Sequence, residues 1–241
     1  MQHVKDQNWF AVGLDVIVVI VGIFLGMQVQ QWYEDNNKKQ DEQFTLVQLE
    51  NEFREIKSHL EKQISARSRW TDYLAILVAT IEETKTDTSD QEIKLGLDAA
   101  SNAGRQAPQS ATFLQLLSSG ELSLITSPKL RKLLMQYDSR LKRDAFVHEM
   151  LIDLVFKEFS DNRHVDRNMF TDDRVSAQID RELDSIESVI ANIRSFDLEE
   201  MKRRESHYEA IYRIHVIQLT AEETQLEFAE EILALISAAK K

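Results

Sequence analysis

Cysteine is absent from this chain of 241 residues, and glycine and proline are scarce, with six and two copies. Without thiols the chain can form neither a disulfide framework nor a thiolate metal site. Few helix breakers, with abundant Glu, Lys, Leu, Gln and Ala, predict an all-α fold. Acidic residues outnumber basic ones, 41 to 29, for a net charge of −12. The basic surface that nucleic-acid binding needs is lacking, so we expect no nucleic-acid partner.

One long apolar run stands near the start of the chain, from Trp9 to Tyr33. Between Trp9 and Val29 its only charged residue is Asp15. About 21 residues make roughly 30 Å of α-helix, enough to cross the hydrocarbon core of a bilayer. Trp9 at one end, with Trp32 and Tyr33 at the other, are aromatic residues suited to anchor a span at the headgroups. The sequence predicts a single transmembrane helix over residues 9–33, with the lipid bilayer as a partner.

A cleaved signal peptide and a buried core helix are the alternatives to a span. A signal peptide has an apolar core of about 7–15 residues followed by a small-residue cleavage site. This run is longer and leads into Gln28, Gln30 and Gln31 without such a site. Its length and flanking aromatic residues argue against a core helix, so we expect the span to be retained.

One face of the expected span carries its acid and two of its glycines. At 100° per residue, Val19, Gly22 and Gly26 lie within about 40° of Asp15. Gly22 and Gly26 form a G-x-x-x-G pair, whose spacing lets two helix backbones approach closely in lipid. Acids in membranes usually turn towards another helix or a watery cavity. The pattern predicts that this face packs against a second copy or another membrane protein. The alternatives are an ion role for Asp15, or a chance arrangement.

Beyond the span, a heptad stripe of apolar residues runs from Leu46 to Ile81 and is interrupted by the polar Gln63 and Arg67. No glycine or proline breaks this part of the chain. We therefore expect the membrane helix to continue as a stalk over residues 34–84, ending near Glu83.

Cap signals divide residues 85–241 into further helices, such as the S-x-x-E box of Ser89 with Glu92. We expect helices over residues 90–104, 110–117, 128–159, 172–194 and 198–238, folded as an antiparallel bundle or coiled-coil-like domain. The expected stripe of the last helix is Met201, Tyr208, Tyr212, Leu219, Leu226, Leu233 and Ile236, with polar Glu205, His215 and Glu222 in the same register.

No phosphate-binding loop, metalloprotease motif or nucleophile elbow is present. His207 and His215 lie two turns apart, but neither has the Glu three residues earlier that di-iron bundles use. The oxygen-rich connector 161–166 lacks the glycine of an EF-hand loop. Ser118 and Ser119 have no base at a readable spacing, and Gly120 suits a helix end. We therefore expect no enzyme activity, no cofactor and no metal.

Two segments resemble a family of uncharacterised bacterial membrane proteins. The first is HVKDQNWFAVGLDVIVVIVGIFLGMQVQQW, from His3 to Trp32. Members of the family usually have an acid just inside the span and an I-G-x-x-x-G/A-x-Q-x-x-x-W exit, where this chain reads V-G-I-F-L-G-M-Q-V-Q-Q-W. The second is FLQLLSSGELSLITSPKLRKLLMQYDSRL, from Phe113 to Leu141. The resemblance implies a bacterial origin, one N-terminal span with the N-terminus inside, and a helical region behind it. It implies no chemistry.

The side of the membrane on which the domain lies is indicated by two signals that disagree. Lys38 and Lys39 after the span, against Lys5 before it, slightly favour a cytoplasmic domain. Long domains translocate largely regardless of charge, however, and the resemblance implies an inside N-terminus. We expect a single-pass protein of the bacterial inner membrane with a periplasmic C-terminal domain.

The expected function is protein–protein association, as a self-associating structural or scaffold component anchored in the membrane. A periplasmic bundle that senses a ligand and signals through a partner is one alternative. A channel or ion-motor subunit that uses Asp15 is another.

Overall fold

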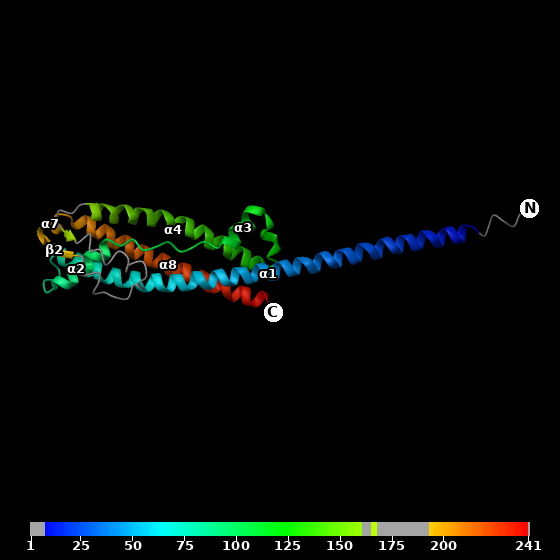
Figure 1. Ribbon diagram of the computed structural model, residues 1–241, viewed down its shortest axis with the longest axis horizontal. Helices are drawn as coiled ribbons and strands as arrows, with labels where there is room; N and C mark the ends of the chain where they lie inside the picture. Colours follow the sequence, from blue (N-terminus) through cyan, green and yellow to red (C-terminus); the bar gives the residue numbers. More distant parts are fainter. Residues whose placement is uncertain (1–7, 161–164, 168–192, 241) are drawn as a thin grey trace, which may run out of the picture.

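The computed structural model describes residues 8–160, 165–167 and 193–240. In these residues the protein is a rod of long helices from which one helix projects alone (Figure 1). The all-α class is confirmed, since the only strands in the described ranges are β1, Val165–Arg167, and β2, Ile193–Phe196. They pair antiparallel at the end of the rod far from the projecting helix (Figure 1).

Helix α1, Asn8–Ile81, contains the expected span and the expected stalk in one uninterrupted helix of 74 residues. At 1.5 Å per residue it is about 110 Å long. Glu83 follows with φ of +58°, a left-handed conformation that no helix continues through. The helix therefore ends two residues before the expected position, at the first point where the backbone turns.

Helix α8, Glu205–Ala239, lies between α1 and α4, Pro128–Ser160, and runs antiparallel to both (Figure 1). Helix α2, Asp90–Ala100, packs on α1. Their approach is closest at Gly96, where a Cβ atom would lie 2.6 Å from Cβ of Leu77. The expected capping box of α2 is confirmed, because Ser89 and Glu92 bond each other's backbone N–H groups.

Helix α3, Ala111–Ser119, is fastened to α1 by an acid of α1. The Glu52 carboxylate accepts hydrogen bonds from the Ser110 hydroxyl at 2.6 Å and from the backbone N–H of Thr112 at 3.1 Å. Acceptors at this place satisfy N–H groups that a helix start leaves without partners. Gly120 ends α3 with φ of +76°, as expected, and the short 3-10 helix η1, Glu121–Leu124, follows.

Two hydrophobic clusters form the core along the rod. The cluster next to the projecting helix joins α1, α3, α4 and α8, and its largest members include Leu46, Phe53, Phe113, Leu134, Tyr137 and Ile232. The cluster at the far end joins α1, α2, α4, α8 and the strands, and includes Leu74, Leu97, Leu151, Val165, Tyr208 and Ile211.

Several sequence-based boundaries were wrong. Helix α2 ends at Ala100 rather than near Gly104. The expected polar connector contains β1, and Ile193 and Arg194, at the end of the helix expected over 172–194, lie in β2. The rest of that helix, residues 172–192, lies outside the described residues. The expected last helix is divided into α7, Leu198–Lys202, and α8, and the Asp197 side chain caps α7 by accepting from the backbone N–H of Glu200.

The buried face of α8 also differs from the expected stripe. Tyr208 and Ile236 are buried as expected, but Leu219, Leu226 and Leu233 are only half-buried. The buried positions beside them are instead Gln218, Gln225 and Ile232. Polar side chains therefore occupy the core in the middle of α8.

Candidate functional site

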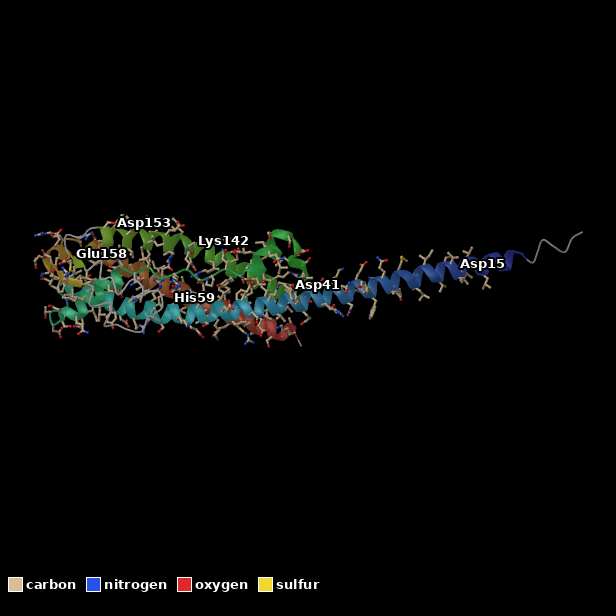
Figure 2. The ribbon with its side chains drawn as sticks, in the orientation of Figure 1. Asp15, Asp41, His59, Lys142, Asp153 and Glu158 are labelled. Carbon is tan, nitrogen blue, oxygen red and sulfur yellow. The ribbon has the colours of Figure 1, made fainter. Side chains whose placement is uncertain are left out.

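The apolar end of α1 projects beyond the bundle, and Figure 2 shows Asp15 on this free part of the helix. Among the described residues α1 is the one helix long and apolar enough to cross a membrane, and its most apolar window is wholly unburied in the monomer. Trp32 and Tyr33, at the end of the apolar run, are 69% and 61% exposed. Trp9 lies in the first turn of α1. The apolar segment thus has no cover from its own chain in the described structure.

The candidate packing face of Asp15, Val19, Gly22 and Gly26 lies on this free segment. Val19 is exposed, and a Cβ atom added at Gly22 or Gly26 would meet no atom within 4 Å. Since the helix is continuous, the four residues share one face of an unbroken α-helix. The face is therefore open to another helix.

A second candidate site lies inside the bundle, between the two hydrophobic clusters. Its centre is Arg67 of α1, none of whose surface is exposed, paired with the buried Glu222 of α8. Arg67 Nε donates to both carboxylate oxygens of Glu222 at 2.9 Å, and Nη2 lies 2.8 Å from Oε1. A charged group in the core needs such a partner, because desolvation of an unpaired ion is very unfavourable.

His215 of α8 is a second partner of the Arg67 guanidinium. Arg67 Nη1 lies 3.2 Å from His215 Nδ1; since arginine only donates, Nδ1 accepts and the ring proton is on Nε2. Burial lowers the pKa of His215 to about 3, and the charge of Arg67 adds to this shift. His215 is therefore a neutral acceptor near pH 7. Burial raises the pKa of the Glu222 carboxyl, and its hydrogen bonds and charge attraction with Arg67 act against that rise.

Helix α4 contributes Asp144 to the same level of the bundle. Its carboxylate accepts from Gln225 Nε2 of α8 at 2.7 Å and from Arg140 Nε at 3.1 Å. His148, one turn further along α4, is buried as well, and burial lowers its pKa. We name the set Arg67, Asp144, His148, His215, Gln218, Glu222 and Gln225 the polar layer.

The connection from α2 to α3 closes the polar layer on the side of α1. Arg67 Nη2 donates to the backbone carbonyl of Ala103 at 3.2 Å, and Gln63 Nε2 donates to that of Arg105 at 2.8 Å. Gly104 lies between them with φ of +71°, and a Cβ atom there would be 2.7 Å from Arg67 Nη2. Glycine meets both requirements, a left-handed backbone and close approach to a side chain.

These contacts join elements that are far apart in the chain. The Arg67 donors are directed at Glu222, His215 and Ala103, and within the described residues neither histidine of the layer bonds a hydroxyl nucleophile. The layer holds α1, α8 and the α2–α3 connection together. The sequence pattern placed Arg67, His215 and Glu222 within apolar stripes, but it did not show that they meet.

The other polar residues considered from the sequence lie apart. His207 is not beside His215; its Nε2 lies 3.3 Å from the buried Glu158 of α4, whose carboxylate also accepts from Tyr208. Figure 2 shows Glu158 near the end of the rod opposite Asp15. In the described ranges the one group of acids spaced for a cation is Glu82, Glu205 and Glu209. All three have solvent access, as acidic surface groups commonly do. Of the oxygen-rich connector 161–166, residues 161–164 lie outside the described residues, and Asp166 lies in β1.

Comparison with known proteins identifies no relative: no protein-family model, no curated protein and no solved structure matches this chain.

Proposed function

We propose that this chain is a single-pass membrane protein whose helical domain acts through protein–protein contacts, and that copies associate through the face of Asp15, Val19, Gly22 and Gly26. The observation that carries the proposal is the uncovered apolar end of α1, which projects from a bundle with its own core. A segment of this hydropathy is stable in water only if something covers it, and a bilayer of about 30 Å matches its length.

The packing face supports a second copy as the partner in the membrane. Lipid covers the aliphatic side chains of the span, but an acid is costly in hydrocarbon and favours a protein neighbour. Gly22 and Gly26 leave space in which a second backbone can approach. In a symmetric pair the packing face of one copy covers the packing face of the other, so no further polypeptide is needed to cover it.

The proposed location is the bacterial inner membrane with the bundle in the periplasm. It is supported by the resemblance of the span to bacterial proteins with an inside N-terminus, and by the indifference of long domains to flanking charge during translocation.

Native mass spectrometry after gentle extraction from membranes tests the association. We expect multiples of the 28.0 kDa chain for the wild type. The variant Gly22→Leu/Gly26→Leu is expected to be monomeric, because two leucine side chains keep the backbones apart. Gly13→Leu is the matched control, since Gly13 is open but lies about 150° around the helix from the face. It should associate as the wild type does.

Oligomers that persist unchanged in Gly22→Leu/Gly26→Leu would remove the span face from the proposal. A wild-type complex containing a different polypeptide in place of a second copy would assign the association to that partner.

A further inference from the structure

Two large apolar side chains of α1 remain exposed after the helix has left its apolar segment. Phe44 is 66% exposed and Val47 is 44% exposed, although Thr45 and Leu46 beside them are buried in the bundle. Figure 2 shows Asp41, three residues before Phe44 in the sequence, where α1 joins the bundle. A single exposed apolar residue is common on proteins, so the position of these two on the helix decides whether they have a role.

Phe44 and Val47 lie on the same face of α1 as the packing face in the span. At 100° per residue both fall within about 40° of the direction of Asp15. Tyr33, which lies along the helix between Gly26 and Phe44, points in the same direction as Asp15. The bundle core of α1, from Leu46 to Leu60, is centred about 180° away. The packing face of the span is therefore on the same side of α1 as Phe44 and Val47. On the stalk, this side is opposite the side that packs into the bundle.

The spacing along this face suits two helices that stay together over a long distance. Val19, Gly26 and Tyr33 follow at intervals of seven residues; the next position of this repeat is the polar Gln40, and Val47 occupies the one after it. A G-x-x-x-G pair is compatible with a right-handed crossing at about −40°, which separates the helices beyond the contact, whereas a seven-residue repeat favours left-handed pairing at about 20°. We take the left-handed pairing for this face, because it keeps neighbouring helices in contact over a long distance. Two spans anchored in one membrane with the same orientation are parallel, so a two-fold axis places Phe44 opposite Phe44 of the second copy.

Lipid is a poor cover for these side chains. Phe44 lies eleven residues after Tyr33, or about 16 Å along the helix. The headgroup region beyond the hydrocarbon core is only about 5–8 Å thick on each side. With Tyr33 at the interface, Phe44 stands in water above the membrane, where burial of an aromatic ring is favourable.

We propose that the self-association face continues out of the membrane along α1 and ends at Phe44 and Val47, where the bundles of two copies meet. This inference rests on the proposed association of the spans. Polar Asn51 and Ser58 follow in the same direction on α1, so the apolar contact ends after Val47.

Photo-crosslinking in native membranes tests the inference. The photoreactive analogue p-benzoylphenylalanine at position 44 keeps the phenyl ring and adds a benzoyl group at its para position, which the exposed site can accommodate. We expect illumination to give a covalent dimer of twice 28.0 kDa, that is, about 56 kDa. The control is the same analogue at Asp35, which is exposed but lies about 180° around the helix; it should give no dimer. A Phe44 analogue that yields only lipid adducts, or an adduct with a different polypeptide, would overturn the inference.

A second variant separates this inference from the proposed function. Phe44→Ser/Val47→Ser should reduce the dimer fraction in native mass spectrometry while leaving the circular dichroism of the domain unchanged. If the Gly22→Leu/Gly26→Leu variant abolishes association but Phe44 gives no crosslink and the serine variant associates fully, the inference fails and the proposed function stands. If the wild type is monomeric in membranes, both fail.

Discussion

At the scale of single residues, the position of Arg67 in the core is the most unusual feature of the bundle. A buried ion pair adds little net stability over a well-packed apolar pair, because desolvation offsets the attraction. Its geometric demand is strict, however, since the guanidinium of Arg67 reaches Glu222, His215 and Ala103 together only when α1 and α8 are in one register. The polar layer thus specifies the register of α1 against α8. The apolar clusters on either side of it constrain that register less, because apolar contacts are not directional.

Removing one member of the ion pair should be strongly destabilising. We expect Arg67→Met to lower the free energy of unfolding by about 3–5 kcal/mol, because it leaves Glu222 charged and unpaired in the core. The double variant Arg67→Met/Glu222→Met should recover most of this loss. The measurement is chemical unfolding in mild detergent, followed by circular dichroism.

The control for this series is Arg69→Met, two residues along α1 at an exposed position. It should change the free energy of unfolding by no more than about 0.5 kcal/mol. A loss in Arg67→Met no larger than that of the control would show that the pair is not buried as the structure places it.

At the scale of helices, α2 and α1 are joined by a backbone contact that depends on Gly96. A Cβ atom there would lie 2.6 Å from Cβ of Leu77 and 3.0 Å from the carbonyl oxygen of Tyr73. Both neighbours belong to the body of α1 and have little freedom to move. Glycine has a low helix propensity, but at this position its lack of a side chain allows α2 to pack closely on α1.

Substitution of Gly96 by alanine has two opposing effects on stability, a gain from higher helix propensity and a loss from overpacking against α1. Alanine at an exposed position in a helix is more favourable than glycine by about 1 kcal/mol, but at Gly96 we expect Gly96→Ala to destabilise the domain by about 1–3 kcal/mol through overpacking. Gln91→Ala, at an exposed site of the same helix, should have almost no effect. Thermal unfolding of the three proteins checks this, and a stabilised Gly96→Ala would contradict the contact.

At the scale of the whole molecule, the rod and its projecting helix divide the chain into a part that buries itself and a part that does not. The described core begins at Leu46 and continues to Ile236, while the apolar run before it has no partner in the monomer. The C-terminus returns to the place where α1 leaves the bundle (Figure 1). The part of the domain that the structure describes therefore lies on one side of the proposed membrane.

The proposed orientation predicts where the domain is accessible. The chain has no cysteine, so Asp153→Cys, at an exposed site of α4, supplies a single reactive thiol. In intact spheroplasts a membrane-impermeant maleimide should label it fully. Gln2→Cys, on the other side of the span, should react only after lysis. The reverse pattern would place the domain in the cytoplasm.

The sequence alone determined the features that depend on local chemistry. Scarce breakers predicted the all-α class, Ser89 with Glu92 predicted the start of α2, and Gly120 predicted the end of α3. Helix caps and breakers act through hydrogen bonds within a few residues, so their pattern is readable without the fold. The length of the apolar run at the start of α1 was equally readable, because it depends on composition alone.

Only the tertiary structure decided which face of α8 is buried. Along the sequence, Leu219 and Leu226 are more apolar than Gln218 and Gln225, yet the glutamines lie inside. Asp144 of α4 and Arg67 of α1 make a polar interior favourable at this level, since Gln225 bonds the former and Glu222 the latter. That choice depends on residues 80 or more positions away in the chain, and a pattern confined to one helix carries no information about them.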